Sequence, residues 1–299
     1  MNKSFRRPAV VAGLVLAGGL GLSSPASAST CSSHVWDGGS GSATAENVDS
    51  YCATAIAYAK YRGTATATNT DSYKGYAKAV AKYKGTATAS NTDSAKGDAT
   101  ARAGYKAVAT AANVDSYKGD AEARAGSRST ASASNTGSSY SEAVAKAGDD
   151  ADATASNTDS DGAKAVAKAD DSGSATATNT DSDGARAIAI AGEGSTAVAT
   201  NSGSSDAPSG EVVRLLEESD PSRAIAIADN GGSAKAKTSD GGTAIAKALD
   251  GGRASAAAYK GGTAIAISYD GCRVHAVAKT ADDYVVKTCG DEPVESVQN

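Results

Sequence analysis

The sequence predicts an all-β fold, a flat two-layer parallel β-solenoid with an alanine-filled core. Two regularities support this prediction. Asn recurs at a constant step of 22 residues through eight copies, from Asn47 to Asn201, and Ala occupies every second position in the segments between them. A constant step is typical of units that stack in one dimension. Alternation with period two places every Ala on one side of a strand, whereas in a helix the same spacing would define no face.

Composition argues against an ordinary globular core. Beyond residue 28 the chain contains only three Leu, eight Ile and sixteen Val. So few large apolar side chains would, by composition alone, indicate a disordered chain. The regular repeat indicates instead that small side chains pack between two sheets that lie closer than usual. Backbone hydrogen bonds between successive coils are then expected to provide much of the order.

Residues 1–28 are typical of a secretory signal peptide. A basic start is followed by an apolar stretch at 9–22 and by the small-residue cleavage site Ala26-Ser27-Ala28. The apolar stretch is too short and too rich in Gly for a membrane span. We therefore expect a secreted protein, extracellular or associated with the cell surface, with no membrane span.

The two ends of the exported chain are expected to be capped, by residues 29–42 at the start and by residues 280–299, which form a cap and tail, at the finish. Cysteines in an exported chain indicate disulfides, and the simplest of three pairings is local. Each bridge would then protect the open strand edge at one end of a rod. The four cysteines, whose spacing is not that of a metal site, are Cys31, Cys52, Cys272 and Cys289.

Residues 43–204 are predicted to form coils of 22 residues with two strands each. Ala stands two and four residues before each Asn, and each Asn is expected to open a turn. Asp recurs two residues after most of these Asn residues and is expected to cap the turn. A calcium loop is the less favoured interpretation, because Lys168 occupies the position where such a loop needs Glu. Tyr61, Tyr83 and Tyr105 fall in one column and are expected to stack at a corner, with a carbohydrate-binding aromatic strip as the less favoured interpretation.

The repeat changes after Ser204. Residues 205–221 break the pattern, and within them residues 211–217 have the composition of a short amphipathic helix. From residue 222 to 279 a row of ten residues takes over, as in Thr243–Lys247 and Thr263–Ile267 with their Gly-rich turns. Two such rows make a coil of 20 residues, so we expect one continuous solenoid with shortened turns.

The residues that alternate with Ala before each Asn are expected to face water as a flat array. Of the 24 positions at five, three and one residues before the eight Asn, 13 are Thr and 6 are Ser, and only Glu46 and Asp152 are charged. The candidate ligand-binding residues are the threonines of this array, namely Thr44, Thr64, Thr66, Thr68, Thr86, Thr88, Thr110, Thr130, Thr154, Thr176, Thr178, Thr196 and Thr200.

These rows, over roughly residues 42 to 201, resemble the Thr-array ice-binding surfaces of insect β-solenoid antifreeze proteins, one class of which also has an Ala-filled, compressed core. The resemblance implies that Thr hydroxyls and methyls hold ordered water that matches ice, so ice or another flat ordered surface is the implied partner. The match departs where Ser dilutes the outer columns and where Glu46 and Asp152 interrupt the plane. The competing interpretation is that Thr and Ser simply suit exposed strands.

The opposite face is expected to be charged at first and aliphatic towards the C-terminus. An exposed apolar stripe needs a cover or a partner, which could be residues 211–217, a second copy or an envelope component. The alternative function is a cell-envelope-associated structural or adhesive repeat protein that uses this stripe or the charged face. The ten-residue rows also show a weaker resemblance to the head repeats of trimeric autotransporter adhesins. The stripe comprises Ile188, Ile190, Ile225, Ile227, Ile245, Ile265 and Ile267.

The sequence does not indicate an enzyme. Its two histidines, His34 and His275, lie near the ends, and no nucleophile, phosphate-loop or metalloprotease motif occurs. A net charge of −5 without a basic run disfavours nucleic acid. An active site also needs a unique place, which a repeat does not offer. We predict a non-enzymatic protein that needs no cofactor and no metal.

Overall fold

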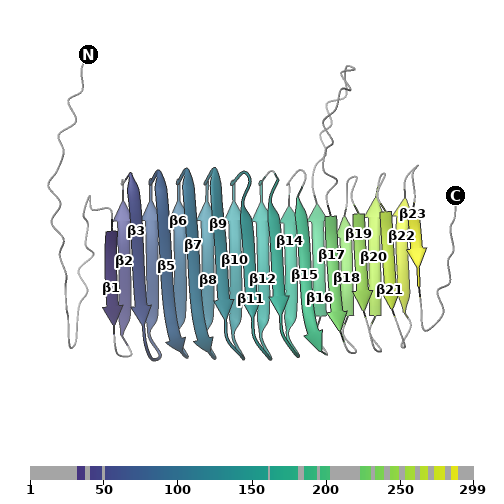
Figure 1. Cartoon of the computed structure of the whole chain (residues 1–299), viewed down its shortest axis with the longest axis horizontal. Helices are drawn as coiled ribbons and strands as arrows, with labels where there is room; N and C mark the ends of the chain where they lie inside the picture. The colour runs from purple at the N-terminus through teal and green to yellow at the C-terminus, as the bar shows by residue number, and fades with distance from the viewer. Residues whose placement is uncertain are drawn as a thin grey trace, which may run out of the picture.

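The structure is a computed structural model of the chain. The residues that it describes are 32–37, 41–48, 51–160, 162–180, 185–193, 196–202, 223–229, 233–238, 243–248, 253–259, 263–268, 273–279 and 284–288. Every regular element in these ranges is a β-strand, and the strands follow one another along a long flat rod (Figure 1). Odd-numbered strands form one parallel sheet and even-numbered strands another. This confirms the predicted two-layer parallel β-solenoid.

The two sheets are named sheet A and sheet B. Sheet A consists of β1 (Ser32–Asp37), β3 (Cys52–Ala59), β5 (Lys74–Tyr83), β7 (Lys96–Tyr105), β9 (Lys118–Ala125), β11 (Glu142–Ala147), β13 (Lys164–Ala169), β15 (Arg186–Glu193), β17 (Arg223–Asp229), β19 (Thr243–Ala248), β21 (Thr263–Ser268) and β23 (Tyr284–Lys287). Sheet B consists of β2 (Ser42–Val48), β4 (Thr64–Thr70), β6 (Thr86–Thr92), β8 (Val108–Val114), β10 (Thr130–Thr136), β12 (Asp152–Thr158), β14 (Ser174–Thr180), β16 (Thr196–Ser202), β18 (Ser233–Thr238), β20 (Arg253–Tyr259) and β22 (Val274–Lys279).

The register of the ladders follows the sequence repeat. Thr66 pairs with Thr88, one 22-residue step further on, and the same step relates the other strands of this half. The ladder then continues across the break in the pattern, because Ile188 pairs with Ile225 and Ile225 pairs with Ile245. The shorter C-terminal coils therefore extend the same solenoid, as expected. Residues 205–221, including the helix expected at 211–217, lie outside the described residues.

Alanine fills the space between the sheets. Inward residues such as Ala89, Ala111 and Ala167 are fully buried, while the alternate residues of the same strands are wholly or partly exposed. Cα atoms of consecutive strands, which belong to opposite sheets, come within 8 Å of each other. Burial of one methyl group contributes only about 0.8 kcal/mol. The backbone ladders must therefore supply much of the stability, as composition suggested.

A ladder of buried asparagines runs inside the solenoid along one margin of sheet B. From Asn47 to Asn201 each Nδ2 donates to Oδ1 of the next Asn, at 2.6–3.1 Å. The sequence suggested that each Asn opens a turn, but Asn lies within the strand and points inward. Space beside the ladder is short, since a Cβ built on Gly97 in sheet A would lie 2.9 Å from Cβ of Asn91.

The turns repeat a left-handed backbone conformation at fixed positions. At the corners that lead from sheet B to sheet A, Asp71, Asp93 and Asp115 have φ of 51°. Gly137 occupies the same column with φ of 60°. Asp and Gly tolerate this region better than most residues do. The Asp column is thus explained by turn geometry, in line with the interpretation that Asp serves the turns.

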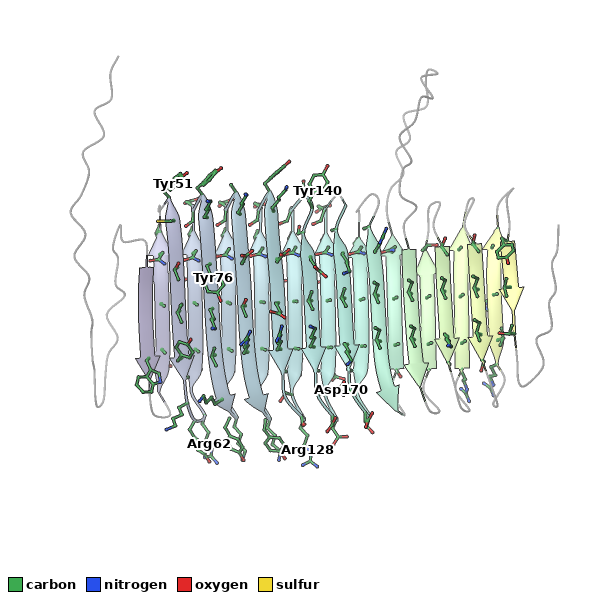
Figure 2. The ribbon with its side chains drawn as sticks, in the orientation of Figure 1. Tyr51, Arg62, Tyr76, Arg128, Tyr140 and Asp170 are labelled. Atoms are coloured by element: carbon green, nitrogen blue, oxygen red, sulfur yellow. The ribbon has the colours of Figure 1, made fainter. Side chains whose placement is uncertain are left out.

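The opposite corners, which lead from sheet A to sheet B, present a tyrosine stack. Tyr61, Tyr83 and Tyr105 stack with ring centroids 5.2 and 5.8 Å apart, which confirms the expected corner stacking. The basic residue after each Tyr lies over its ring, as with Lys84 at 5.4 Å from the Tyr83 centroid. Arg62 and Arg128 mark this margin of the rod in Figure 2, where Tyr51 and Tyr140 mark the other.

Strand pairing extends into the segments expected to cap the solenoid. β1, within residues 29–42, pairs in parallel with β3, and β23, within residues 280–299, pairs with β21. Cys52 begins β3 and is not a free thiol. Cys31, Cys272 and Cys289 lie outside the described residues, so the pairing of the cysteines stays a prediction.

Candidate functional site

The outer face of sheet B is a grid of small polar side chains. In β4, inward Ala65, Ala67 and Asn69 alternate with outward threonines. The same alternation continues through β14 in the 22-residue coils. Outward residues lie ~7 Å apart along a strand and ~4.8 Å apart between neighbouring strands. The face is therefore a periodic surface rather than a pocket.

The central column of this grid is the most regular. Thr44, Thr66, Thr88 and Thr110 stand in register in β2 to β8. Ser132 follows in β10, and Thr154 and Thr176 continue the column in β12 and β14. Six Thr and one Ser in consecutive strands present the same hydroxyl once per coil.

All thirteen threonines proposed from the sequence lie on this one face, and none of them is buried. The threonines fall into three columns. The column five positions before Asn contains Thr64, Thr86, Thr130 and Thr196. The column three positions before Asn contains Thr44, Thr66, Thr88, Thr110, Thr154 and Thr176, and the column one position before Asn contains Thr68, Thr178 and Thr200. The structure thus brings the whole predicted set together.

Sequence reasoning missed a fourth column. The residue after each Asn also points outward, and Thr70, Thr92, Thr136 and Thr158 stand in one line, with Val114 between Thr92 and Thr136. The three-column interpretation ended the strand at Asn because Asn is a turn former. The signal was present, because the alternation simply continues through Asn as an inward residue. A four-residue row such as Thr64 to Thr70 widens the array by one column.

The predicted interruptions lie where the sequence placed them. Exposed Glu46 pairs with Thr68 in the first row of the array, and exposed Asp152 lies between Thr130 and Ser174. The array ends after β16, where Lys235 takes the column position of Val198. The rows from β4 to β10 therefore form the longest stretch without a charged outward residue.

The core beneath the array fixes its geometry. Each row stands on buried Ala, and the Asn ladder ties consecutive rows together through hydrogen bonds between side chains. At the C-terminal end of the ladder, Nδ2 of Asn201 donates to the carbonyl oxygen of Ala185 in the turn region of sheet A, at 3.1 Å. Such a support holds the outward side chains on a rigid surface, which reduces the ordering needed on binding.

The outer face of sheet A has a different character. A column of acidic residues, Asp98, Asp120 and Glu142, continues as Lys164 and Arg186. Desolvation and the neighbouring Asp120 carboxylate raise the pKa of Asp98, partly offset by a backbone hydrogen bond. The pKa of Asp120 is also raised, by desolvation foremost and by the Glu142 carboxylate, while the hydrogen bond from the Glu142 N–H lowers it. Asp98 lines an open surface hollow together with Thr54, Lys74, Tyr76 and Lys96.

The residues expected to be aliphatic form a true column on sheet A. Ile188, Ile225, Ile245 and Ile265 stand in register, and Val144 and Val166 precede them. Ile190 and Ile227 form a second line, which continues through Lys247 to Ile267. These side chains are partly buried.

His275 lies on the outer face of sheet B in β22, aligned with Ser255. Of the residues that the structure describes, no group of three or more His, Cys, Asp or Glu is arranged to hold a metal ion. Asp49, Asp161 and Asp181, which belong to the Asp-rich turns, are outside the described ranges.

The chain matches no protein-family model, no curated protein and no solved structure. The part of the chain with described coordinates has no helix of the length and apolarity needed to cross a membrane. Function must therefore be argued from the two outer faces.

Proposed function

We propose that the protein is a secreted, non-enzymatic ice-binding protein and that the outer face of sheet B is its ice-binding surface. The observation that supports this most directly is the central column, in which Thr66, Thr88 and Thr110 align in consecutive strands. The partner that fits such a surface must be flat and periodic, because the array is flat and periodic. The resemblance to Thr-array antifreeze proteins supports ice as that partner.

The proposed mechanism uses both parts of the Thr side chain. Each hydroxyl can donate one hydrogen bond and accept others from water. Each methyl group excludes water from the space beside it, so the water that remains is confined between neighbouring rows. Because the rows repeat every ~4.8 Å on a rigid support, this water adopts a regular arrangement that can join a growing crystal. β-Branched Thr has restricted χ1 freedom, so the hydroxyl and methyl positions are already defined.

The proposal includes export and two disulfides. Residues 1–28 would be removed, and Cys31–Cys52 and Cys272–Cys289 would close the two ends. The intact mass of the secreted protein, measured before and after reduction, tests both points. A protein that begins at Ser29 and gains four hydrogens on reduction is expected, and a mass unchanged by reduction would contradict the disulfides.

The central experiment is ice-crystal growth and thermal hysteresis of the oxidised protein, residues 29–299. Faceted crystals and a gap between melting and freezing are expected. Thr88→Tyr, in the middle of the array, should reduce the gap at equal concentration by about tenfold, as loss of a central contact does in other interfaces. The large ring would stand above the plane and keep neighbouring rows from the ice.

A matched control is Thr100→Tyr. Thr100 also points outward from a strand interior, but from sheet A, between Lys78 and Glu122. This variant should keep full activity, and circular dichroism should show both variants folded. Equal activity of the Thr88 and Thr100 variants would reject the sheet B mechanism. Round, freely growing crystals with the wild-type protein would reject ice binding altogether and leave the array as solvent-facing strand chemistry.

A further inference from the structure

Three outward columns run along most of the outer face of sheet A, and their charges are ordered across the strand. In β5, β7 and β9 a further exposed column, Lys74, Lys96 and Lys118, stands two residues before the first of them. In β7, β9 and β11 an acidic residue in the first column is followed four residues later by a basic residue in the third. The three pairs are Asp98 with Arg102, Asp120 with Arg124, and Glu142 with Lys146. The middle column, which contains Thr100, Glu122 and Val144, lies between them.

Stacking along the solenoid brings like charges together in these columns. The carboxylates of Asp98 and Asp120 are neighbours in the ladder, and so are the guanidinium groups of Arg102 and Arg124. Like charges at ~4.8 Å repel one another, and the raised pKa values of the two Asp residues reflect part of this repulsion. Lys96 and Lys118, two residues before Asp98 and Asp120 on the same face, supply positive charge on one side of the acidic column. A line of opposite charge with the same spacing, placed opposite each column, would compensate it further.

The middle column becomes aliphatic in the next strands. From β11 to β23 it contains Val or Ile in every strand, all in register and all partly exposed: Val144, Val166, Ile188, Ile225, Ile245, Ile265 and Val286. A continuous apolar line of this length is typical of a surface that packs against something else.

We propose that two copies of the chain associate through the outer faces of their A sheets, related by a two-fold axis parallel to the length of the solenoid and centred on the middle column. This axis keeps each strand opposite the same strand of the second copy but reverses its direction. The first column of one copy then faces the third column of the other. The middle column faces itself.

Charge complementarity supports this arrangement. Asp98 would face Arg102 of the second copy, and Asp120 would face Arg124 of the second copy. Glu142 would face Lys146 in the same way, and the symmetry forms each pair twice. In the same interface the aliphatic residues from Val144 to Val286 would cover one another over seven strands.

Three rows would bring like charges together, and their side chains have contacts within the chain. Lys78 would face itself, and its Nζ lies 6.0 Å from the centroid of the Tyr58 ring. Lys164 would face Lys168 of the second copy, but Nζ of Lys164 lies 2.9 Å from Oε1 of Glu142, and Nζ of Lys168 lies 3.5 Å from Oδ1 of Asp170. Glu122 would face itself, and it forms an ion pair with Arg124 in its own chain. These partners reduce the repulsion that the symmetry would create.

The size of the face also fits a dimer. Twelve strands spaced ~4.8 Å apart and three outward residues per strand give a face of about 50 by 15 Å. Each copy would bury about 750 Å², and the pair about 1,500 Å², which is the size of a standard specific interface. The alternative two-fold axis, parallel to the strands, would lay the charged rows around Lys78 and Glu122 on the aliphatic half, where burial of charge against Ile is costly. The proposed axis places a charged position opposite Ile in two rows only, where Arg186 and Arg223 lie opposite Ile190 and Ile227 of the second copy.

The dimer is independent of ice binding, because it leaves sheet B of both copies facing outward in opposite directions. The test is the mass of the oxidised protein, residues 29–299, by sedimentation equilibrium. The wild type is expected to be a dimer. Asp120→Arg and Arg124→Asp should each weaken association by about tenfold or more, since each places like charges opposite one another at two symmetric sites.

Charge exchange is the decisive arm of the experiment. The double variant Asp120→Arg with Arg124→Asp restores opposite charges across the proposed axis, as does an equimolar mixture of the two single variants. Both should return to wild-type affinity within about threefold. Failure of both to recover, with circular dichroism showing folded protein, would reject the proposed pairing.

The aliphatic half has its own variant and control. Ile225→Lys should weaken association strongly, because residue 225 would face itself across the axis. Val108→Lys introduces the same side chain at an exposed aliphatic position of sheet B and should leave the dimer intact. A wild-type protein that is monomeric at all concentrations tested would overturn the proposal. The aliphatic column would then be covered by something other than a second copy. Thermal hysteresis of Ile225→Lys should equal that of the wild type per array, so failure of one proposal does not decide the other.

Discussion

The two sheets share one alanine core and one ladder geometry, yet their outer faces differ along the whole rod. Sheet B repeats the same small polar side chains from coil to coil, as at Thr66, Thr88 and Thr110. Sheet A changes from charged residues around Asp120 to aliphatic residues around Ile225. Because outward positions are free of the packing constraint that fixes Ala inside, their regularity on sheet B needs an explanation other than folding.

The supports of the two sheets differ as well. Only sheet B, among the described residues, has the line of buried amides that joins Asn47 to Asn201. Sheet A has small residues such as Gly97 on the facing side, where the ladder leaves no room for a Cβ. The comparison teaches that one face is held at a fixed spacing by side chains in addition to the backbone.

The largest expected effect comes from interrupting the Asn ladder, which supports sheet B and not sheet A. Asn113→Leu removes both hydrogen bonds of the central amide and leaves Nδ2 of Asn91 and Oδ1 of Asn135 buried without partners. Each such group costs about 1–3 kcal/mol, so a loss of about 2–6 kcal/mol is expected in the free energy of unfolding. Urea denaturation measures it. The control Thr110→Val, outward on the same strand, should change stability by at most about 0.5 kcal/mol.

A second prediction separates inward from outward positions on one strand. Ala111→Leu inserts three carbon atoms between sheets that have no space for them, and should cost about 1–3 kcal/mol or more. Thr110→Leu, one residue away but outward, should leave the thermal midpoint nearly unchanged. Equal effects of the two substitutions would mean that the core is not compressed and that alternation does not control packing.

Much of the fold could be predicted because every coil contains the same sequence pattern. The inward Ala columns define strands, their period defines the coil, and the continuation of Ile188 into Ile225 followed from matching rows. The position of Asn could not be predicted from its usual role in turns. Its ladder depends on amides from neighbouring coils, a contact that no single segment contains.

The site was predicted in part for the same reason. The three columns before Asn were recognised by alternation with Ala, whereas the column of Thr70 and Thr92 was missed because Asn was taken as the end of the strand. The charge order across sheet A was also missed. It emerges only when Asp120 and Arg124 are seen to share a face with their counterparts in neighbouring strands.

The smallest predicted effect concerns the pH dependence of stability, which should differ between the acidic column of sheet A and the neutral threonine array of sheet B. Asp120 in sheet A lies between the carboxylates of Asp98 and Glu142, and its pKa is raised above the ordinary value of 3.8. A raised pKa means that the folded state binds the proton more tightly than the unfolded state does. The charged form therefore opposes folding above the raised pKa, and that cost disappears as the pH falls below 3.8.

Asp120→Asn removes this charge and should raise the stability at pH 7 by less than about 1 kcal/mol, because solvent screens an exposed carboxylate. The gain relative to wild type should shrink as the pH is lowered and vanish below the ordinary pKa of Asp, when thermal midpoints are compared at a protein concentration low enough to keep both proteins monomeric. The neutral comparison on sheet B is Ser132→Asn, in the middle of the threonine array. Its effect should be independent of pH, because neither side chain titrates. A gain for Asp120→Asn that persists unchanged at low pH would show that the acidic column is not what distinguishes the two faces energetically.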